Sequence, residues 1–193
     1  MGLETDKKEL RKRAAQRRKI AYDAQPDASQ KIASFAPLIA QKFQPTQVAA
    51  YWPIRSEIDP IALLSALSGD GVGSSLPITP EEGKPLQFHE WRVGDALVTG
   101  PYQTKEPLST SPLCIPDVIL APLLAFDAQC WRLGYGGGFY DRTIAGLEAA
   151  GHNVIVIGIA FDESAVEKVP TGPYDRALSA IVTPSGLKLP QVR

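Results

Sequence analysis

"DVILAPLLAFDAQCWRLGYGGGFYDRTIAGLEAAGHNVIVIGIAF", residues 117–161, contains a complete strand–loop–helix–strand pattern. The apolar run that opens it predicts one continuous buried strand over 117–126. A glycine-rich loop follows, and residues 139–151 predict a helix that ends at a glycine. Residues 153–161 are almost entirely apolar and predict a second buried strand. Strands joined through a helix favour a parallel sheet, so this stretch predicts an α/β fold.

The rest of the chain continues the alternation of strands and helices. Further helices are expected at 6–23, from Asp27 or Ser29 to Phe43, and at 59–69, where Asp59 is the predicted cap. Further strands are expected at 47–53, 71–78, 85–91 and 178–183. The second helix is expected to bury Ile32, Phe35, Leu38, Ile39 and Phe43.

Residues 91–117 are rich in proline, glycine, serine and threonine and predict a long irregular loop. Together these elements predict one α/β domain over residues 1–193, with a mostly parallel central sheet flanked by helices. In such sheets ligands bind at the carboxyl ends of the strands, which is where the glycine-rich loop falls.

Composition narrows the functional classes. The 193 residues carry a net charge of −1, so no overall field attracts nucleic acid or membranes. The apolar runs are too short to span a bilayer, and the first residues lack the apolar segment of a signal peptide. Two cysteines without metal-type spacing indicate neither a disulfide framework nor a zinc site. We expect a cytoplasmic protein that acts as a monomer, with no nucleic-acid or membrane partner.

The loop "RLGYGGGFYDR", Arg132 to Arg142, has the chemistry of an anion site. Glycines let backbone amides approach an anion closely, and the following helix adds its unpaired N–H groups. Arg132 offers a forked donor for phosphate oxygens, and Asp141 offers a carboxylate for magnesium. These parts describe a Mg-nucleotide site. The residues alone leave a second reading open, in which the loop is a flexible turn and Arg132 merely pairs with Asp141.

The loop matches neither of the common phosphate motifs, GxxxxGK[ST] and GxGxxG. It closely resembles the signature of the 5-formyltetrahydrofolate cyclo-ligase family, also called methenyltetrahydrofolate synthetase. Other segments resemble the same family in order and spacing: "KKELRKRAAQRR", "YWPIRSEID", "LAPLLAFD", "FDESAVEKVP" and "YDRALSAIVT". The resemblance covers nearly the whole chain.

The resemblance implies a single Rossmann-like domain of the NagB/RpiA/CoA-transferase-like type. It also implies conversion of 5-formyltetrahydrofolate to 5,10-methenyltetrahydrofolate, with ATP as co-substrate and Mg²⁺ as cofactor. The ATP-binding residues that it implies are Lys7, Lys8, Arg11, Arg132, Leu133, Gly134, Tyr135, Gly136, Gly137, Gly138, Phe139 and Tyr140. Trp52, Glu57 and the segment Tyr135 to Phe139 would bind the reduced folate. Asp141 and Asp175 would hold the metal, and Arg132 and Tyr140 would be catalytic.

Plainer roles compete with several of these assignments. The basic run Lys7 to Lys19 is typical of a solvated helix face, and Trp52 at a strand end is typical of a core residue. Glu57 has a chemical reason to be chosen, because a carboxylate accepts two of the donors that a pterin presents in a row. Its alternative is a surface carboxylate or a cap.

This sequence departs from the usual family pattern at four positions, which are Cys130 for a glycine, Ser164 for a glutamine, Tyr174 for a histidine and Ser179 for an aspartate. A paralogue that binds nucleotide or phosphate without folate cyclo-ligase activity therefore remains the alternative function.

Overall fold

The computed structural model describes residues 2–69, 71–172 and 175–191. The α-helices are α1 (Leu3–Ala24), α2 (Ala28–Ala33), α3 (Ala36–Phe43), α4 (Ile61–Leu67) and α5 (Phe139–Ala149). The strands are β1 (Gln47–Ala49), β2 (Gly73–Ile78), β3 (Gln87–Glu90), β4 (Leu97–Thr99), β5 (Lys105–Pro107), β6 (Leu113–Cys114), β7 (Val118–Pro122), β8 (Ala125–Phe126), β9 (Arg132–Leu133), β10 (Ile155–Ile159), β11 (Ala180–Thr183) and β12 (Gly186–Lys188). Two short 3₁₀ turns are η1 (Pro101–Gln103) and η2 (Asp162–Ser164).

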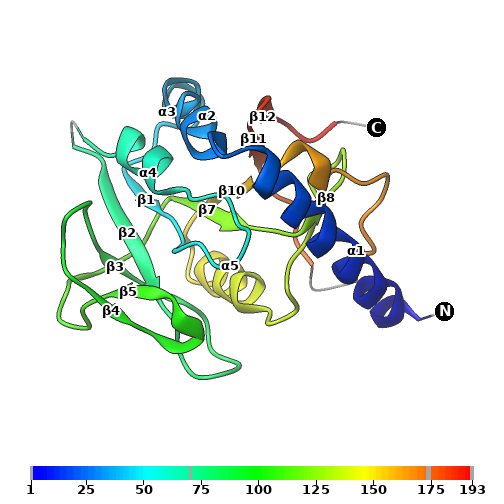
Figure 1. Cartoon of the computed structure of the whole chain (residues 1–193). Helices are drawn as coiled ribbons and strands as arrows, with labels where there is room; N and C mark the ends of the chain where they lie inside the picture. The colour runs from blue at the N-terminus through cyan, green and yellow to red at the C-terminus, as the bar shows by residue number, and fades with distance from the viewer. Residues whose placement is uncertain (1, 70, 173–174, 192–193) are drawn as a thin grey trace.

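An eight-stranded sheet forms the centre of the described chain, in the order β12-β11-β10-β7-β1-β2-β3-β6. The five strands from β11 to β2 are parallel, whereas β12, β3 and β6 pair antiparallel at the edges. Helices α2, α3 and α4 cover one face of the sheet and α5 covers the other (Figure 1). The predicted α/β class and the mostly parallel sheet are confirmed.

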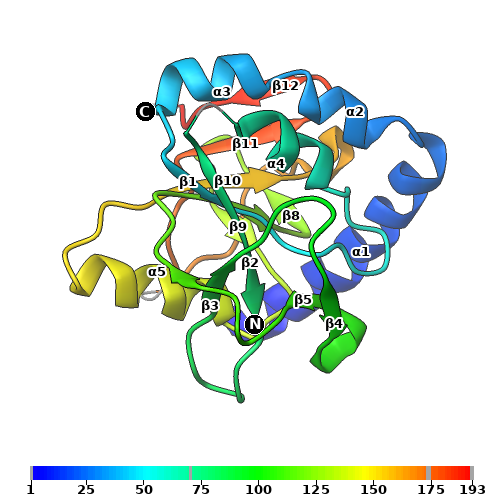
Figure 2. The same ribbon diagram turned by 90° about the vertical axis from the view of Figure 1, so that its left-hand side faces the viewer.

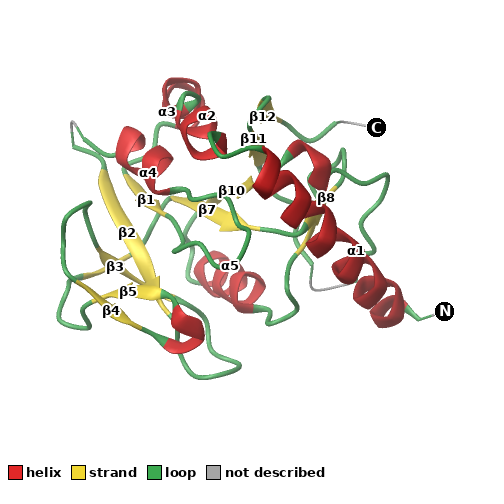
Figure 3. Ribbon diagram, in the orientation of Figure 1, coloured by secondary structure: helices red, strands yellow, loops and turns green. Residues whose placement is uncertain are grey.

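Each central strand is buried on both faces, which explains its continuous apolar sequence. Along β7, Val118 and Leu120 pack into the core beneath α2 and α4, while Ile119 and Ala121 pack into the core above α5. Successive side chains alternate between the two faces of a strand, so one apolar run supplies both layers. Figure 3 shows the sheet between its two helical layers.

The buried strand expected over 117–126 is wrong in its length. Strand β7 ends at Pro122, and the chain then turns so that β8 pairs antiparallel with β9 in a separate two-stranded sheet. The apolar run continues because Leu123, Leu124 and Ala125 are buried too. Ala14 of α1 packs against Leu124 and Ala125, so the helix lies over this hairpin at the carboxyl end of the sheet.

The irregular loop expected over 91–117 is also wrong. It contains the β4–β5 hairpin, whose turn is η1, and the edge strand β6. Figure 2 shows the β4–β5 hairpin beside β2 and β3. These strands are only two or three residues long, so no two-residue periodicity could reveal them.

The second predicted helix is interrupted. Helix α2 ends at Ala33 and α3 begins at Ala36, with Pro37 in its first turn, where a missing N–H is tolerated. Leu38, which was expected to be buried, is 45% exposed, whereas Ile32 and Ile39 are fully buried. Helix α4 begins at Ile61 with Pro60 in the N-cap position, one residue later than predicted, and Asp59 accepts a hydrogen bond from the Ile61 amide at 2.9 Å from the position before the cap.

Candidate functional site

The glycine-rich loop runs from β9 to the start of α5, as the sequence predicts. Gly136 and Gly138 have φ of 101° and 66°, in the left-handed region that favours glycine. A Cβ on Gly138 would lie 2.6 Å from Nη1 of Arg142. Gly136 and Gly137 are exposed, so the loop offers bare backbone directly before a helix N-terminus.

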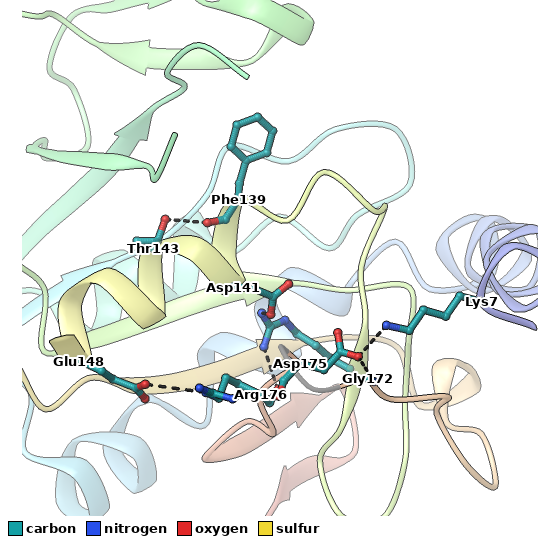
Figure 4. Close-up of polar contacts among 9 residues, drawn as sticks. Lys7, Phe139, Asp141, Thr143, Glu148, Gly172, Asp175 and Arg176 are labelled. Carbon is teal, nitrogen blue, oxygen red and sulfur yellow. Dashed lines mark hydrogen bonds and ion pairs between the residues drawn. The ribbon is translucent and has the colours of Figure 1, made fainter. Parts of the chain in front are cut away.

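Three cationic side chains reach this loop and its surroundings. Arg11 Nε on α1 donates to the Gly134 carbonyl at 3.1 Å. Lys7 Nζ, one turn earlier on α1, lies 2.6 Å from Asp175 Oδ2. Arg132 Nη2 lies 2.5 Å from Asp141 Oδ1 in the first turn of α5. Figure 4 shows Lys7 extending from α1 to Asp175, with Asp141 close by at the start of α5. The structure therefore brings Lys7, Arg11, Arg132, Asp141 and Asp175 together from four segments of the chain.

Each of the two carboxylates that were predicted to bind the metal forms an ion pair with a cation that was predicted to bind phosphate. Asp175 Oδ2 also accepts a hydrogen bond from the Gly172 amide at 2.6 Å. Partial burial opposes ionisation of Asp175, but the bonds from Lys7 and Gly172 outweigh it and hold its pKa below the usual value. Asp175 is therefore ionised at neutral pH.

These carboxylates fit a magnesium ion. Within the described residues, Asp141 Oδ2 and Asp175 Oδ1 accept no hydrogen bond, so each carboxylate keeps one free hard oxygen. The described part of the chain contains no cluster of three or more metal-binding side chains. Magnesium is commonly held by one or two carboxylates together with substrate phosphates and water, which is what this arrangement could offer.

A buried ion pair also contacts the loop, through Tyr135. Arg18 of α1 and Glu57, from the segment after β1, are each 3% exposed in their side chains, and Arg18 Nη1 lies 3.7 Å from Glu57 Oε1. Arg18 also donates to the Tyr135 hydroxyl, to Ser56 Oγ at 3.3 Å and to the Leu123 carbonyl at 3.4 Å. Its guanidinium lies 5.2 Å from the centre of the Tyr135 ring. Arg18 thus joins the glycine loop to Glu57.

Burial raises the pKa of the Glu57 carboxyl to about 7. The Ile54 amide, which donates to Glu57 Oε2 at 2.8 Å, and the charge of Arg18 partly offset this effect. Glu57 is therefore poised between its two protonation states near neutral pH. Burial also raises the pKa of the nearby Tyr135 and Tyr140 hydroxyls, so both remain protonated. These rings can donate hydrogen bonds but cannot act as bases at neutral pH.

Some predicted binding residues lie elsewhere or can contribute only backbone. Lys8 is exposed, on a different face of α1 from the buried Lys7. Leu133 is buried in the core, so only its backbone can face a ligand. Trp52 is half-buried and packs edge-on against the buried Trp91, with ring centres 6.4 Å apart. The core reading of Trp52 therefore has direct packing support.

Sequence reasoning missed two arginines. Arg18 was hidden in the basic run, yet it lies on the buried stripe of α1 with Lys7, Ala14 and Ala21, and that spacing was a usable signal. Arg142 Nη2 donates to the Gly137 carbonyl at 2.7 Å, and its guanidinium lies 5.3 Å from the Phe139 ring centre. Its Nε is buried without a hydrogen-bond partner among the described residues.

The departures from the family pattern have distinct structural settings. Cys130 is buried and has φ of 60°, a conformation that suits the glycine usual in the family. Ser164 is buried, and its hydroxyl has no partner in the described part of the chain. Ser179 Oγ accepts a hydrogen bond from the Val156 amide at 3.3 Å. Tyr174 lies outside the described residues.

One cavity lies away from the glycine loop. A cavity at the amino ends of β1 and β2, lined by Gln47, Gly73 and Trp91 among others, is at the opposite edge of the sheet from the glycine loop. It is therefore separate from the candidate site.

No helix in the described ranges combines the length and the apolar character needed to cross a bilayer.

Comparisons with known proteins agree with the sequence resemblance. The family model for the 5-formyltetrahydrofolate cyclo-ligase family matches residues 4–184. A 5-formyltetrahydrofolate cyclo-ligase of Mycolicibacterium smegmatis is 37% identical over 145 residues, 71% of this chain and 73% of that protein. A protein of the same name from Escherichia coli K12 is 32% identical over 174 residues, 88% of this chain and 94% of that protein.

A solved structure supports the fold independently. The 5,10-methenyltetrahydrofolate synthetase of Aquifex aeolicus superposes with a TM-score of 0.78 at 24% identity, covering 97% of this chain and 94% of that one. The sequence matches confirm the family and the enzyme class that the glycine signature predicts: the chain belongs to the 5-formyltetrahydrofolate cyclo-ligase family.

Proposed function

We propose that this protein converts 5-formyltetrahydrofolate and ATP to 5,10-methenyltetrahydrofolate, ADP and phosphate, with Mg²⁺ as cofactor. The observation that carries the proposal is that two contrasting groups of residues lie beside the glycine loop. The first contains Lys7, Arg132 and two carboxylates, and the second is the buried Arg18–Glu57 pair. The first suits a metal-bound polyphosphate, and the second suits a neutral ring system rich in hydrogen-bond donors.

The phosphates of ATP would lie beside Lys7, Arg11 and Arg132. Lys7, Arg11 and Arg132 supply charged donors there, and the amides of Gly136 to Gly138 supply neutral ones at the N-terminus of α5. Lys7 and Arg132 would exchange their carboxylate partners for phosphate oxygens as the nucleotide binds. Asp141 and Asp175 would then hold magnesium, which would neutralise part of the phosphate charge.

The pterin ring of the folate would be bound by Glu57. Ionised Glu57 would accept hydrogen bonds from two adjacent N–H groups of the pterin, and its charge would strengthen both bonds. Arg18 keeps this carboxylate ionised for part of the population at pH 7, and it also fixes Tyr135 beside it. Trp52 would contribute an apolar edge to this pocket, although its ring packs mainly against Trp91.

The reaction needs no nucleophile from the protein. The formyl oxygen of the folate attacks the γ-phosphorus of ATP, and the bond to the bridging oxygen of ADP breaks. N10 then attacks the formyl carbon and loses its proton, and phosphate leaves with the former formyl oxygen. Arg132 would stabilise the charge on the transferred phosphoryl group, and the protonated Tyr140 hydroxyl would donate a hydrogen bond. Catalysis here consists of positioning and charge neutralisation.

The test is a direct assay with purified protein, Mg-ATP and 5-formyltetrahydrofolate. The near-ultraviolet absorbance of the methenyl product should rise, with one ADP formed per turnover. Omission of ATP, or removal of magnesium with a chelator, should abolish the signal. 5-Methyltetrahydrofolate, which lacks the formyl oxygen, should not react. A protein that binds Mg-ATP but produces no methenyl product would favour the alternative of a nucleotide-binding paralogue.

A further inference from the structure

The turn of the β4–β5 hairpin has an uncommon backbone. Tyr102 and Gln103, two consecutive residues with side chains, have φ of 60° and 62°. The left-handed region is unfavourable for residues other than glycine. Such a conformation persists where surrounding contacts enforce it, and it often occurs at binding sites.

A buried carboxylate holds the turn from beneath. Glu106 is 4% exposed, and its Oε1 accepts hydrogen bonds from the Thr79 amide at 3.2 Å and from Thr104 Oγ1 at 3.1 Å. Gly100, at the other end of the turn, makes room for this carboxylate, since a Cβ there would lie 2.1 Å from Glu106 Cδ. The two ends of the turn are thereby fixed, and the residues between them have little freedom.

The turn presents Tyr102 to the glycine loop. Tyr102 is 66% exposed, and its ring meets Phe139 edge-on, with ring centres 6.5 Å apart and planes inclined by 70°. Phe139 is the first residue of α5. Figure 4 shows its ring pointing away from Asp141 and Asp175, the side proposed for magnesium and phosphate. The Tyr102–Phe139 pair therefore lies at the rim of the site, on the side away from the metal carboxylates.

The glycine loop connects this aromatic pair to the pterin pocket. Tyr135 at one end of the loop touches Arg18 beside Glu57, and Phe139 at the other end touches Tyr102. Four residues of chain span at most about 14 Å, so the two ends of the loop lie no farther apart than roughly the length of the pteroyl part of a folate. A pterin held at Glu57 could therefore reach the rim with its p-aminobenzoyl ring.

We infer that Tyr102 is a folate-positioning residue whose ring packs against the p-aminobenzoyl ring of the substrate, together with Phe139. The inference rests on the proposed function, since it concerns the orientation of the same folate. Aromatic pairs add to affinity beyond area burial, and the strained turn prepositions the ring before the substrate arrives.

The first test uses three substitutions at one position. Tyr102→Gly should raise the KM for 5-formyltetrahydrofolate about 3- to 10-fold, with the KM for ATP unchanged. Tyr102→Ala should do the same, and Tyr102→Phe should behave as wild type because the ring carries the effect. Tyr22→Ala, which removes a 45% exposed tyrosine from α1, is the matched control and should change neither KM. Glycine suits the backbone at position 102, so Tyr102→Gly should unfold in urea no earlier than wild type.

The second test separates the two parts of the folate. Inhibition of the wild type by p-aminobenzoylglutamate should weaken in Tyr102→Gly by the same factor as the KM. Inhibition by a reduced pterin without the benzoyl group should not change. A raised KM for ATP alone would place Tyr102 against adenine and overturn the inference, as would unchanged values for both substrates. A wild-type protein that forms no methenyl product would instead contradict the proposed function itself.

Discussion

Arg18→Met tests the proposed role of the buried ion pair through the pH dependence of folate turnover. Methionine approximates the length of the arginine side chain and removes its charge, which lies 3.7 Å from Glu57. An opposite charge at this distance typically lowers a carboxyl pKa by about one to three units. Removal of Arg18 should therefore raise the pKa of Glu57 from about 7 to between about 8 and 10.

The direction of the pH dependence follows from the proposal that the ionised form of Glu57 binds the pterin. In the wild type, kcat/KM for 5-formyltetrahydrofolate should rise with pH through a midpoint near 7. In Arg18→Met the midpoint should move upward by about one to three units, so the rate at pH 7 falls by about 5- to 500-fold and recovers partly at high pH. The assay measures methenyl formation at saturating Mg-ATP between pH 5.5 and 9.5.

Two controls separate charge from folding. Arg18→Lys keeps the charge but loses the forked geometry, so its midpoint should stay near the wild-type value while the KM rises. Circular dichroism should show that Arg18→Met remains folded, because a protonated Glu57 no longer needs a buried counter-ion. A folded Arg18→Met protein that keeps the wild-type midpoint within about half a pH unit would contradict the proposed role of the ion pair.

Three further predictions concern other residues of the site and its support. Asp141→Asn should keep the fold, lower turnover by orders of magnitude and raise the magnesium concentration for half-maximal rate; wild-type turnover and unchanged magnesium demand would reject the metal role. Glu57→Gln should remove a pH-dependent loss of stability. Because folding raises the pKa of Glu57 from 4.5 to about 7, wild-type stability should fall by about 3 kcal/mol as the pH rises through that window, and urea unfolding of both proteins at several pH values measures the difference. Cys130→Gly should unfold at a urea concentration no lower than Cys130→Ala, because glycine relieves the positive φ while both lose the sulfur; at an ordinary buried position the order would be reversed.

The sequence predicted the central layers because their signals are long and physically unambiguous. Strand β10 is a continuous apolar run, and the glycine loop is followed by a helix with a clear stop at Gly151. The end of strand β7 could not be predicted from the sequence, because the residues before and after it are all buried and apolar. An apolar run shows that a segment is buried but not where the chain changes direction. The hairpin β4–β5 and strand β6 were missed because strands of two or three residues depend on their partners, which lie far away in the sequence.

The site was predictable only in part, for a related reason. Local chemistry identified the glycine loop, Arg132 and Asp141, but it could not pair Lys7 with Asp175, which are 168 residues apart. Glu57 could be chosen for its chemistry, but its pKa near 7 depends on burial that arises only when α1 covers the segment after β1. Arg18 looked like one of many charges on a basic helix, and only the spacing of the buried stripe distinguishes it.

The two ion pairs beside the glycine loop would prepare the proposed site for a highly charged ligand. Lys7 with Asp175, and Arg132 with Asp141, balance positive and negative charges around the glycine loop. On the proposed assignment, Mg-ATP brings both signs at once: its phosphates replace the carboxylates as partners of Lys7 and Arg132, while its magnesium replaces the cations as partner of Asp141 and Asp175. ATP without the metal would take the cations and leave two carboxylates uncompensated beside the phosphates, which is unfavourable at these distances. The pairing therefore favours the metal-bound nucleotide over the free one, and this preference should weaken when Asp141 and Asp175 are both changed to asparagine.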